Sequence, residues 1–547
     1  MSSVLHSAAQ RSLRPGIPSD RGLGSGAAWL LLVTALTRWP AWHNRFGESD
    51  TARYAVGILQ WLRHPRHAAA PEIYGRVFSP AYDWAAVTLL RHVPRVAPEL
   101  PILLNGASFV AAVLSAPVLL AVARRFVAEK PAFWATLLFL ATPAFWWLGI
   151  EPHPQGWSSL GYLLAIWLTL RAREAPAYGW TWRAASAMAL ACGLAFKSDL
   201  VLGMAVFPVL EMYPAGWGGS MAVAESPQPA ADGRAIRNDH GEWQSAPSAG
   251  PRWTRVHWLW RCAIGALVPA VASFLFLAMR ALILGEGWKT SQSAAGHAVQ
   301  SFVTWPQGPD LVKQVLPMWL GAGVLTPLFL MGAAFTWRRL EASQRRFWVL
   351  LLTSWSVPGA LFWLLIRGNN ARHTVLLTLP WLWLAAAGWY AQGRERATVF
   401  TLAVLAANFL VVPPNSNIAL YPSGNVPASA ARLAERQAEM RRVAQRLCHP
   451  PPASCYFGWY TNPYVEYDLM QHCGLHGVLQ TWGGATRFEV SAGSRGQVAP
   501  RTVELREVHD FVEFQAAIRA CPGAASLEYS PAGKTWYFGR EVRDRLR

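Results

Sequence analysis

Charge, and lysine above all, is scarce in this sequence. Only 15% of its 547 residues are charged and five of its 49 basic residues are lysine, whereas 53% are hydrophobic and 30 are tryptophan. A typical soluble domain has about 25% charged residues, so this composition excludes an ordinary soluble domain. The net charge of +18 does not indicate nucleic-acid binding, because the arginines are spread beside apolar runs and form no stripe that would follow phosphates.

Cysteine is also scarce, and no tight CxxC pair supports a structural zinc site among the six cysteines. Four of them lie near the C-terminus and would form two disulfides in an oxidising compartment, for which three pairings exist. We expect Cys448 to pair with Cys455, and Cys473 with Cys521. There is no clear DxD motif, so the sequence requires no cofactor and leaves a divalent metal open.

Apolar runs of membrane-spanning character recur along the chain and predict an α-helical polytopic membrane protein. We expect a basic cytoplasmic tail over residues 1–26 and a transmembrane domain over 27–412. The eleven expected spans are 27–43, 100–122, 131–149, 156–170, 183–197, 199–213, 257–279, 316–336, 347–366, 374–391 and 397–412.

Arginine placement predicts the orientation of these spans. The tail holds Arg11, Arg14 and Arg21, which favours a cytoplasmic N-terminus. The remaining short arginine-rich loops fall on the same side only if Ala184–Tyr213 forms two segments, separated at Lys197-Ser198-Asp199. Thirty residues are also too long for one ordinary span. We therefore expect an integral protein of the bacterial inner membrane with a periplasmic C-terminal domain.

Three regions are expected to lie outside the bilayer. The external loop 44–99 predicts two interfacial helices, one of which places Tyr54, Ile58 and Trp61 opposite Gln60, and a second over Pro80–Val93. Residues 214–256, rich in small residues and proline, predict a flexible cytoplasmic insertion. Residues 413–547 predict a small extracytoplasmic α/β domain, with a helix over 427–447 and strands over Cys455–Tyr460, Thr502–Val508 and Thr535–Phe538.

Ionisable residues gather at the predicted outer ends of the spans. Each has an ordinary explanation: a loop acid is normally solvated, Lys197 could snorkel, Glu151 could cap a helix, and Arg372 could anchor a segment end. Ionisable groups beside hydrocarbon are costly, so their convergence on one face indicates a functional site. The candidates are Glu48, Asp50, Arg53, Tyr54, Glu151, His153, Lys197, Arg372 and His373.

The order of several motifs resembles the GT-C glycosyltransferases, especially the branch of protein O-mannosyltransferases and lipid A aminoarabinose transferases. "ESDTARYA" is similar to the acidic-x-Arg-Tyr signature of the first external loop, and "FSPAYDW" to an aromatic, proline-rich segment that opens a later interfacial helix. "GIEPHP" stands where the family has a second external acid. "LACGLAFKSDL" and "NNARHTVLLTLP" resemble two later family segments, so the resemblance covers roughly residues 27–412.

This resemblance implies an inverting enzyme that takes a sugar from a polyprenyl-phosphate donor and passes it to a lipid, glycan or protein. Asp50 or Glu48 would be the catalytic base, and Asp50 has the spacing of the signature. Glu151 would orient the acceptor or support a cation, while Arg53, Lys197 and Arg372 would stabilise the donor phosphate. Tyr54, His153 and His373 would line the substrate site. The chain departs from the family pattern at Ser198, where glycine is usual, and at His373, where tyrosine is usual.

Two other functions fit a polytopic membrane protein. A transporter or flippase of a lipid-linked sugar would line a path with its charged residues, but the sequence has no inverted pair of interrupted helices. A membrane-anchored binding protein would work through its C-terminal domain, but eleven spans exceed what an anchor requires.

Overall fold

The computed structural model describes residues 23–39, 46, 49–63, 79–212, 255–285, 326–365 and 375–410, with short pieces between 438 and 537. In chain order its helices (α) and 3-10 helices (η) are α2 (Leu23–Arg38), α3 (Ser49–Arg63), α4 (Pro80–His92), η4 (Pro94–Glu99), α5 (Leu100–Phe126), α6 (Glu129–Leu140), α7 (Pro143–Leu148), α8 (Gln155–Glu174), η5 (Pro176–Tyr178), α9 (Gly179–Phe196), η6 (Ser198–Gly203), α10 (Val206–Glu211), α12 (Arg255–Leu284), α15 (Thr326–Arg339), α16 (Ala342–Leu365), η8 (Val375–Thr378), α17 (Leu379–Ala391) and α18 (Arg394–Leu410).

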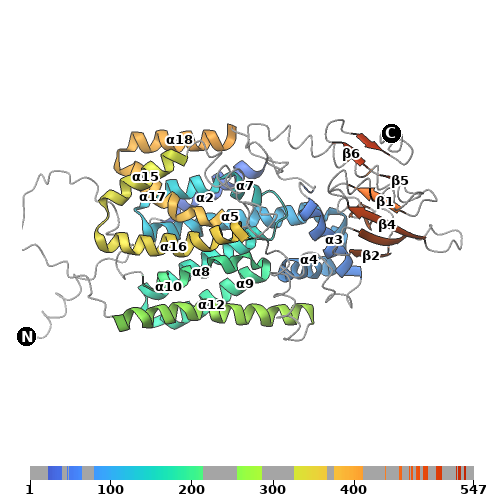
Figure 1. Cartoon of the computed structure of the whole chain (residues 1–547), viewed down its shortest axis with the longest axis horizontal. Helices are drawn as coiled ribbons and strands as arrows, with labels where there is room; N and C mark the ends of the chain where they lie inside the picture. Colours follow the sequence, from blue (N-terminus) through green and yellow to red (C-terminus); the bar gives the residue numbers. More distant parts are fainter. Residues whose placement is uncertain are drawn as a thin grey trace, which may run out of the picture.

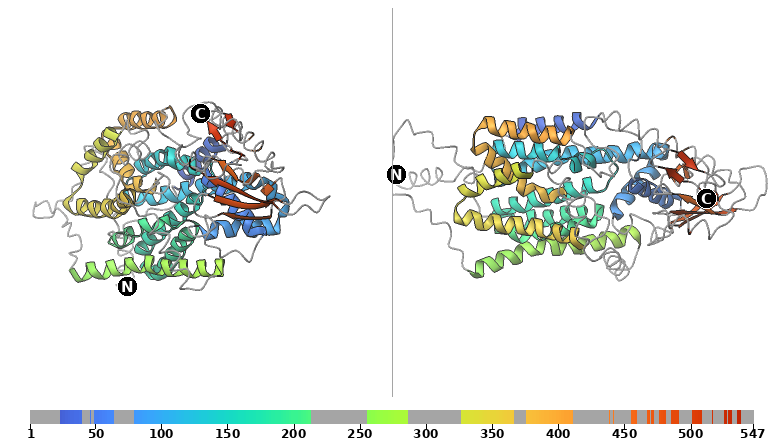
Figure 2. Two further views of the ribbon diagram at one scale, coloured as in Figure 1. Left: turned by 45° about the vertical axis from the view of Figure 1, so that its right-hand side comes forward. Right: turned by 45° about the horizontal axis from the view of Figure 1, so that its top comes forward.

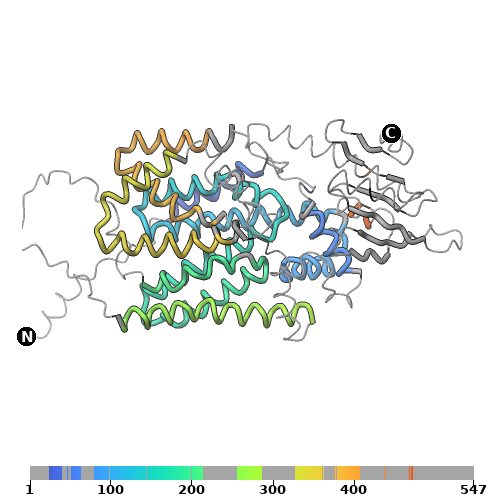
Figure 3. The backbone as a smooth tube through the Cα atoms, viewed as in Figure 1, coloured from blue at the N-terminus to red at the C-terminus, as the bar shows by residue number. Residues whose placement is uncertain are grey.

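The long helices pack side by side as one bundle, with α12 along one side and α18 along another (Figure 1). Helices α3 and α4 lie at one end of the bundle, between it and the C-terminal strands (Figure 1 and the right view of Figure 2). The backbone trace of Figure 3 shows these two helices at the same end. We call this end the α3–α4 end. Within the bundle, α8 packs against both α5 and α9, and α9 packs against α12.

Two described helices, α5 and the Val256–Leu284 part of α12, have both the length and the hydropathy needed to cross a bilayer. Large apolar side chains also point outward from the bundle. On α12, Leu259 is 71% exposed and Phe274 is 60% exposed, and on α18 Val399 is 67% exposed. Apolar surface of this extent is typical of helices that face lipid.

All eleven expected apolar ranges overlap described helices, although the number of membrane crossings stays a prediction. The range 131–149 is not one helix as expected. It is α6 followed by α7, because Pro143 disfavours helical backbone at the residue before it, and Thr142 is extended at φ −61° and ψ 138°. Proline therefore ends this helix within the apolar run.

The expected interruption near Lys197 is present. Helix α9 ends at Phe196, Lys197 is extended at φ −158° and ψ 121°, and η6 follows. The range 199–213 is not one regular α-helix, because it divides into η6 and the short α10. The backbone thus turns at the only lysine of the described helix pair, which places this side chain at the α3–α4 end.

Both helices expected in the first external loop are present, as α3 and α4. The expected division of α3 into an apolar and a polar face is wrong at Gln60, which is only 4% exposed. The reason is that α3 packs on α4 and lies between the bundle and the C-terminal strands, so no broad face of it is left to water.

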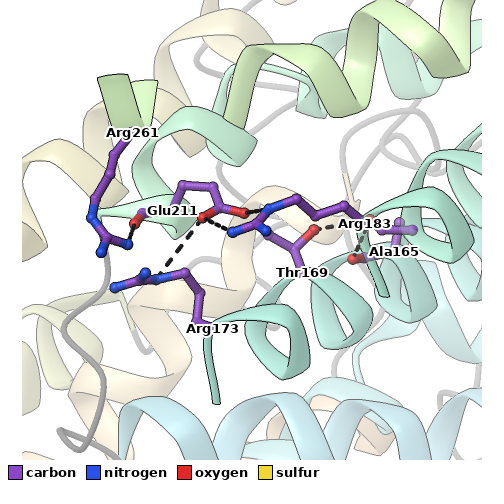
Figure 4. A network of polar contacts seen from close by, with 7 residues as sticks. Ala165, Thr169, Arg173, Arg183, Glu211 and Arg261 are labelled. Carbon is purple, nitrogen blue, oxygen red and sulfur yellow. Dashed lines mark hydrogen bonds and ion pairs between the residues drawn. The ribbon is translucent and has the colours of Figure 1, made fainter. Parts of the chain in front are cut away.

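At the opposite end of the bundle, buried Glu211 at the end of α10 joins four helices (Figure 4). Its carboxylate accepts two hydrogen bonds from Arg183 of α9, at 2.6 and 2.8 Å. Arg173 Nε of α8 lies 3.9 Å from Glu211 Oε2. Arg261 of α12 donates a hydrogen bond to the Glu211 backbone oxygen at 3.5 Å. A bidentate pair of this kind fixes the geometry of the helices that carry it.

The C-terminal segments form a five-stranded mixed sheet in the order β2-β3-β4-β1-β5, and a separate hairpin of β6 and β7. β1 pairs in parallel with β4 and β5, whereas β3 pairs antiparallel with β2 and β4. β1, β4 and β7 fall within or beside the three ranges expected as strands, and most of the helix expected over 427–447 lies outside the described residues. The strands are β1 (Cys455–Gly458), β2 (His476–Gln480), β3 (Ala485–Val490), β4 (Arg501–Glu507), β5 (Ala525–Ser526), β6 (Glu528–Ser530) and β7 (Thr535–Tyr537).

Candidate active site

Helix α3 carries the acidic signature into the α3–α4 end. Asp50 is the second residue of α3, where the helix dipole favours a negative charge; the structure describes its backbone. One turn later, Arg53 is half-buried and Tyr54 is buried. The helix therefore places the expected base and the expected phosphate-binding arginine on adjacent turns.

Lys197 reaches α3 from the end of α9. Its Nζ donates a hydrogen bond to the Tyr54 hydroxyl at 3.1 Å and lies 5.8 Å from the centre of the Tyr54 ring. Both side chains are at most 5% exposed. One contact thus joins residues that are 143 positions apart in the sequence, and it holds the Lys197 ammonium against Tyr54 and away from the surface.

Helix α4 adds two polar residues to this contact. The ring of Tyr82 packs edge-on against Tyr54, with centroids 5.7 Å apart, and Asp83 beside it has no exposed surface. Burial raises the pKa of the Tyr82 phenol well above its usual range. The nearby Asp83, Tyr54 and Glu151 side chains raise the pKa of the Tyr82 phenol further.

Glu151 belongs to a constrained turn between α7 and α8 and is fully buried, as is His153. The Glu151 backbone N–H donates to Trp147 O at 3.1 Å, and the His153 N–H donates to Glu151 O at 2.7 Å. The centroids of the His153 and Trp147 rings lie 4.6 Å apart. The backbone carbonyl of His153 accepts a 3.4 Å hydrogen bond from the Ser108 hydroxyl of α5. The turn is therefore held on both sides.

We define the polar cluster as Tyr54, Tyr82, Asp83, Glu151 and Lys197. Lys197 and Tyr82 both contact Tyr54. Asp83 follows Tyr82 on α4, and Glu151 is near enough for its charge to act on the Tyr82 phenol. The cluster draws two carboxylates, one lysine and two phenols from four separate segments into a place with almost no exposed side-chain surface. Buried ionisable groups of both signs, with one phenol pKa strongly perturbed, are typical of functional sites. The cluster can supply a positive donor to a phosphate and carboxylates to a hydroxyl.

Three expected site residues, Tyr54, Glu151 and Lys197, are members of the cluster, and Asp50 and Arg53 share α3 with it. Tyr82 and Asp83 were missed as site residues, although the "FSPAYDW" segment that contains them was singled out. The available signal was a carboxylate in the first turn of a helix whose central residues are mostly apolar. Cys455 lies in β1, and the expected residues Glu48, Arg372, His373, Cys448, Cys473 and Cys521 lie outside the described residues.

The C-terminal part of the chain contacts the start of this region. Tyr467 packs edge-on against Phe46, which lies just before α3, with ring centroids 4.9 Å apart. Gln471 donates a hydrogen bond to Ala97 O in η4 at 3.1 Å. The C-terminal segments therefore lie against the loop that carries the acidic signature.

Within the described ranges, no group of three or more histidine, cysteine, aspartate and glutamate side chains is arranged to hold a metal ion. The cluster itself brings together two carboxylates, with Lys197 bonded to Tyr54 of the same group.

No protein-family model matches the chain, and no curated protein matches it. Among solved structures it is similar to ArnT from Cupriavidus metallidurans in the apo state, with a TM-score of 0.45 and 14% identity over 81% of this chain and 74% of that one. It is also similar to the Archaeoglobus fulgidus oligosaccharyltransferase complex with Zn and sulfate, with a TM-score of 0.42 and 12% identity over 80% of this chain.

The chain spans 61% of the length of that archaeal oligosaccharyltransferase. At TM-scores below 0.5 these overlaps describe a distant likeness of fold.

Proposed function

We propose that this protein is an inverting membrane glycosyltransferase that moves a sugar from a polyprenyl-phosphate donor to a lipid, glycan or protein acceptor. The observation that carries the proposal is the polar cluster, in which Lys197, directly after α9, donates a hydrogen bond to Tyr54 of the acid-bearing helix α3. A transferase of this kind needs a base, a phosphate-binding cation and a carboxylate at one end of a bundle. We assign these roles to Asp50, Lys197 and Glu151.

The donor phosphate would be bound by the positive groups of α3 and α9. Lys197 supplies an ammonium donor, and Arg53 supplies a guanidinium one turn beyond Asp50. Hydrogen bonds from charged donors to phosphate are roughly twice as strong as neutral ones. Arg372, which the sequence places beside a late span, would complete this site.

The transfer step needs a base on the acceptor. The Asp50 carboxylate would take the proton of the acceptor hydroxyl while that oxygen bonds to the anomeric carbon. The bond from this carbon to the lipid-phosphate oxygen breaks at the same time, and the phosphate leaves with the electron pair. Attack opposite the leaving group inverts the configuration. Lys197 and Arg53 would stabilise the charge that develops on the phosphate.

Buried Glu151 and Asp83 would bind hydroxyl groups of the sugar or the acceptor, since carboxylates accept hydrogen bonds at both oxygens. The proposed topology places the N-terminus in the cytoplasm and the α3–α4 end with residues 413–547 in the periplasm. Polyprenyl-phosphate sugars fit this arrangement, because the lipid tail stays in the bilayer while the phosphate lies at its surface.

Glycosyl transfer by the purified protein tests this proposal. Detergent-solubilised protein is mixed with a polyprenyl-phosphate sugar and extracts containing candidate acceptors, and products are followed by mass spectrometry. We expect a glycosylated acceptor and free polyprenyl phosphate in equal amounts. A protein that yields neither in detergent, but moves the lipid-linked sugar between leaflets of a vesicle, is a flippase and contradicts the proposal.

A further inference from the structure

Arg38 is a buried cation that the proposed mechanism does not use. It is the last residue of α2 and is 1% exposed. Its Nη2 donates to Leu140 O at the end of α6 at 2.7 Å, and its Nη1 donates to Thr34 O at 3.5 Å. The guanidinium also lies 5.9 Å from the centre of the Phe145 ring. Burying a charge in a helical bundle is costly and usually serves a purpose.

Arg38 is packed directly against the backbone of Gly149. A methyl group placed on Gly149 would come within 2.5 Å of Arg38 Nε and 2.8 Å of its Cδ, and within 2.8 Å of the Ala112 side chain on the other side. Gly149 has an ordinary φ of −91°, so the position needs glycine for lack of space and not for backbone conformation. The guanidinium and α5 thus hold this residue between them.

Gly149 begins the turn that carries Glu151. The N–H groups of Gly149 and Ile150 donate to Trp146 O and Trp147 O, at 3.1 and 3.0 Å. The next N–H, that of Glu151, donates to Trp147 O as well. Because the turn is hydrogen-bonded at each residue, a displacement of Gly149 would be passed on to Glu151.

We propose that Arg38 is a positioning residue that fixes Glu151 in the polar cluster by clamping Gly149. The inference rests on the proposed function, since it gives Glu151 its role in the transferase site. In the competing account, Arg38 only ties α2 to α6 and its loss would destabilise the whole bundle without a specific effect on Glu151.

Kinetics separate these accounts. Arg38→Met removes the charge and the hydrogen-bond donors, whereas Arg38→Lys keeps the charge. Gly149→Ala adds a methyl group that pushes Gly149 and Arg38 apart. We expect kcat to fall by about 10- to 100-fold in Arg38→Met and Gly149→Ala, as small misplacements of site groups do, with partial retention in Arg38→Lys. The donor KM should stay unchanged. Arg125→Met is the matched control for Arg38→Met, because Arg125 is 6% exposed, pairs with Glu174 and lies at the opposite end of the bundle.

If Arg38 acts through Glu151, the effects of Arg38→Met and Glu151→Gln are not additive, and the double variant is no slower than Glu151→Gln alone. Losses that multiply would overturn the proposal. So would a fall in kcat that follows only the amount of folded protein, or an equal fall of kcat in Arg125→Met.

A final measurement needs no turnover and so separates failure of this inference from failure of glycosyl transfer. In a Glu151→Cys protein, the rate at which a small thiol reagent modifies position 151 reports how firmly the turn is held. Labelling of the native cysteines is subtracted using the parent protein. We expect Arg38→Met to raise this rate at least about tenfold, in line with local opening of a held segment, and Arg125→Met to leave it unchanged. An equal rate with and without Arg38 would contradict the clamp.

Discussion

The hydrogen bond from Lys197 to Tyr54 joins the end of α9 to helix α3 in the candidate site. The ammonium is held because α9 stops at Phe196 and the extended backbone of Lys197 directs the chain across the bundle end. An ammonium has three N–H donors, so a lysine that donates to a phenol can also donate to another acceptor. A donor phosphate is the acceptor that the proposed function provides.

Lys197→Ala should therefore weaken binding of the lipid phosphate. A hydrogen bond to a charged group is worth about 1.5–3 kcal/mol, so affinity should fall by roughly 10- to 100-fold. Tyr54→Phe is the control: it removes one acceptor from the ammonium but leaves its charge, and should cost less. The check is titration of the purified proteins with polyprenyl phosphate. Equal affinities in Lys197→Ala and the parent protein would show that Lys197 has no part in donor binding.

At the scale of residues, the sequence indicated which side chains belong to the candidate site better than it indicated which residues they lie near. Lys197 and Glu151 stood out because charges are rare in apolar segments, and both are buried in the cluster. Their proximity to Tyr82 could not be predicted, because it depends on how α4 packs against α9. Asp83 was missed for a related reason: in a segment expected at the membrane surface, one acid suggests contact with water.

At the scale of elements, the positions at which single residues end a helix explain most of what the sequence could and could not predict. The division of Ala184–Tyr213 followed from its length and its central charges. The division of 131–149 into α6 and α7 was missed because hydropathy is uniform across it, although Pro143 was a local signal. Burial of Gln60 was unpredictable from periodicity, since a helix covered on several sides has no polar face.

The network around Glu211 makes a prediction at this scale. Glu211→Gln leaves the side chain of Arg183, which is 14% exposed, without a countercharge, and such broken buried pairs cost about 3–5 kcal/mol. Glu129→Gln is matched in chemistry but removes a pair in which the glutamate is 65% exposed, so it should cost about 1 kcal/mol or less. Thermal unfolding in detergent measures both. Similar losses in the two variants would contradict a supporting role for the Glu211 network.

For the whole molecule, the contact between the C-terminal part and the first loop should make stability depend on pH. Burial raises the pKa of Asp468 from 3.8 to about 6, although Arg441 acts in the opposite direction. Between these values the folded protein holds a proton that the unfolded chain releases. Stability from this group is therefore full below pH 3.8, falls as pH rises through about 6, and is constant above that.

Asp468→Asn removes the titrating group, so this slope should flatten. The measurement is the unfolding midpoint of the purified protein between pH 4 and pH 7. Glu129→Gln provides the comparison, because it changes an exposed acid and should keep the slope of the parent protein. An unchanged slope in Asp468→Asn would show that this carboxyl is not buried when the chain is folded.

The membrane orientation is a second prediction for the whole molecule. The arginine distribution places the α3–α4 end and the C-terminal part outside, so cysteines introduced at Gly47 and Gly496 should react with an impermeant thiol reagent in intact cells. A cysteine at Gly233, in the insertion between α10 and α12, should react only after the cells are opened. Reaction at Gly233 from outside would require another arrangement of spans.

The central claim is that α3 holds a catalytic base over a lipid-linked sugar, and one comparison tests it most directly. Asp50→Asn keeps size and hydrogen bonding but cannot accept the acceptor's proton, and general-base catalysis is worth about 10²–10⁴-fold. With purified protein and a polyprenyl-phosphate sugar, we predict that Asp50→Asn lowers turnover by that factor while the protein stays folded and binds the donor, and that Glu48→Gln is milder. Full turnover in Asp50→Asn, whether or not Glu48→Gln is active, would contradict the account.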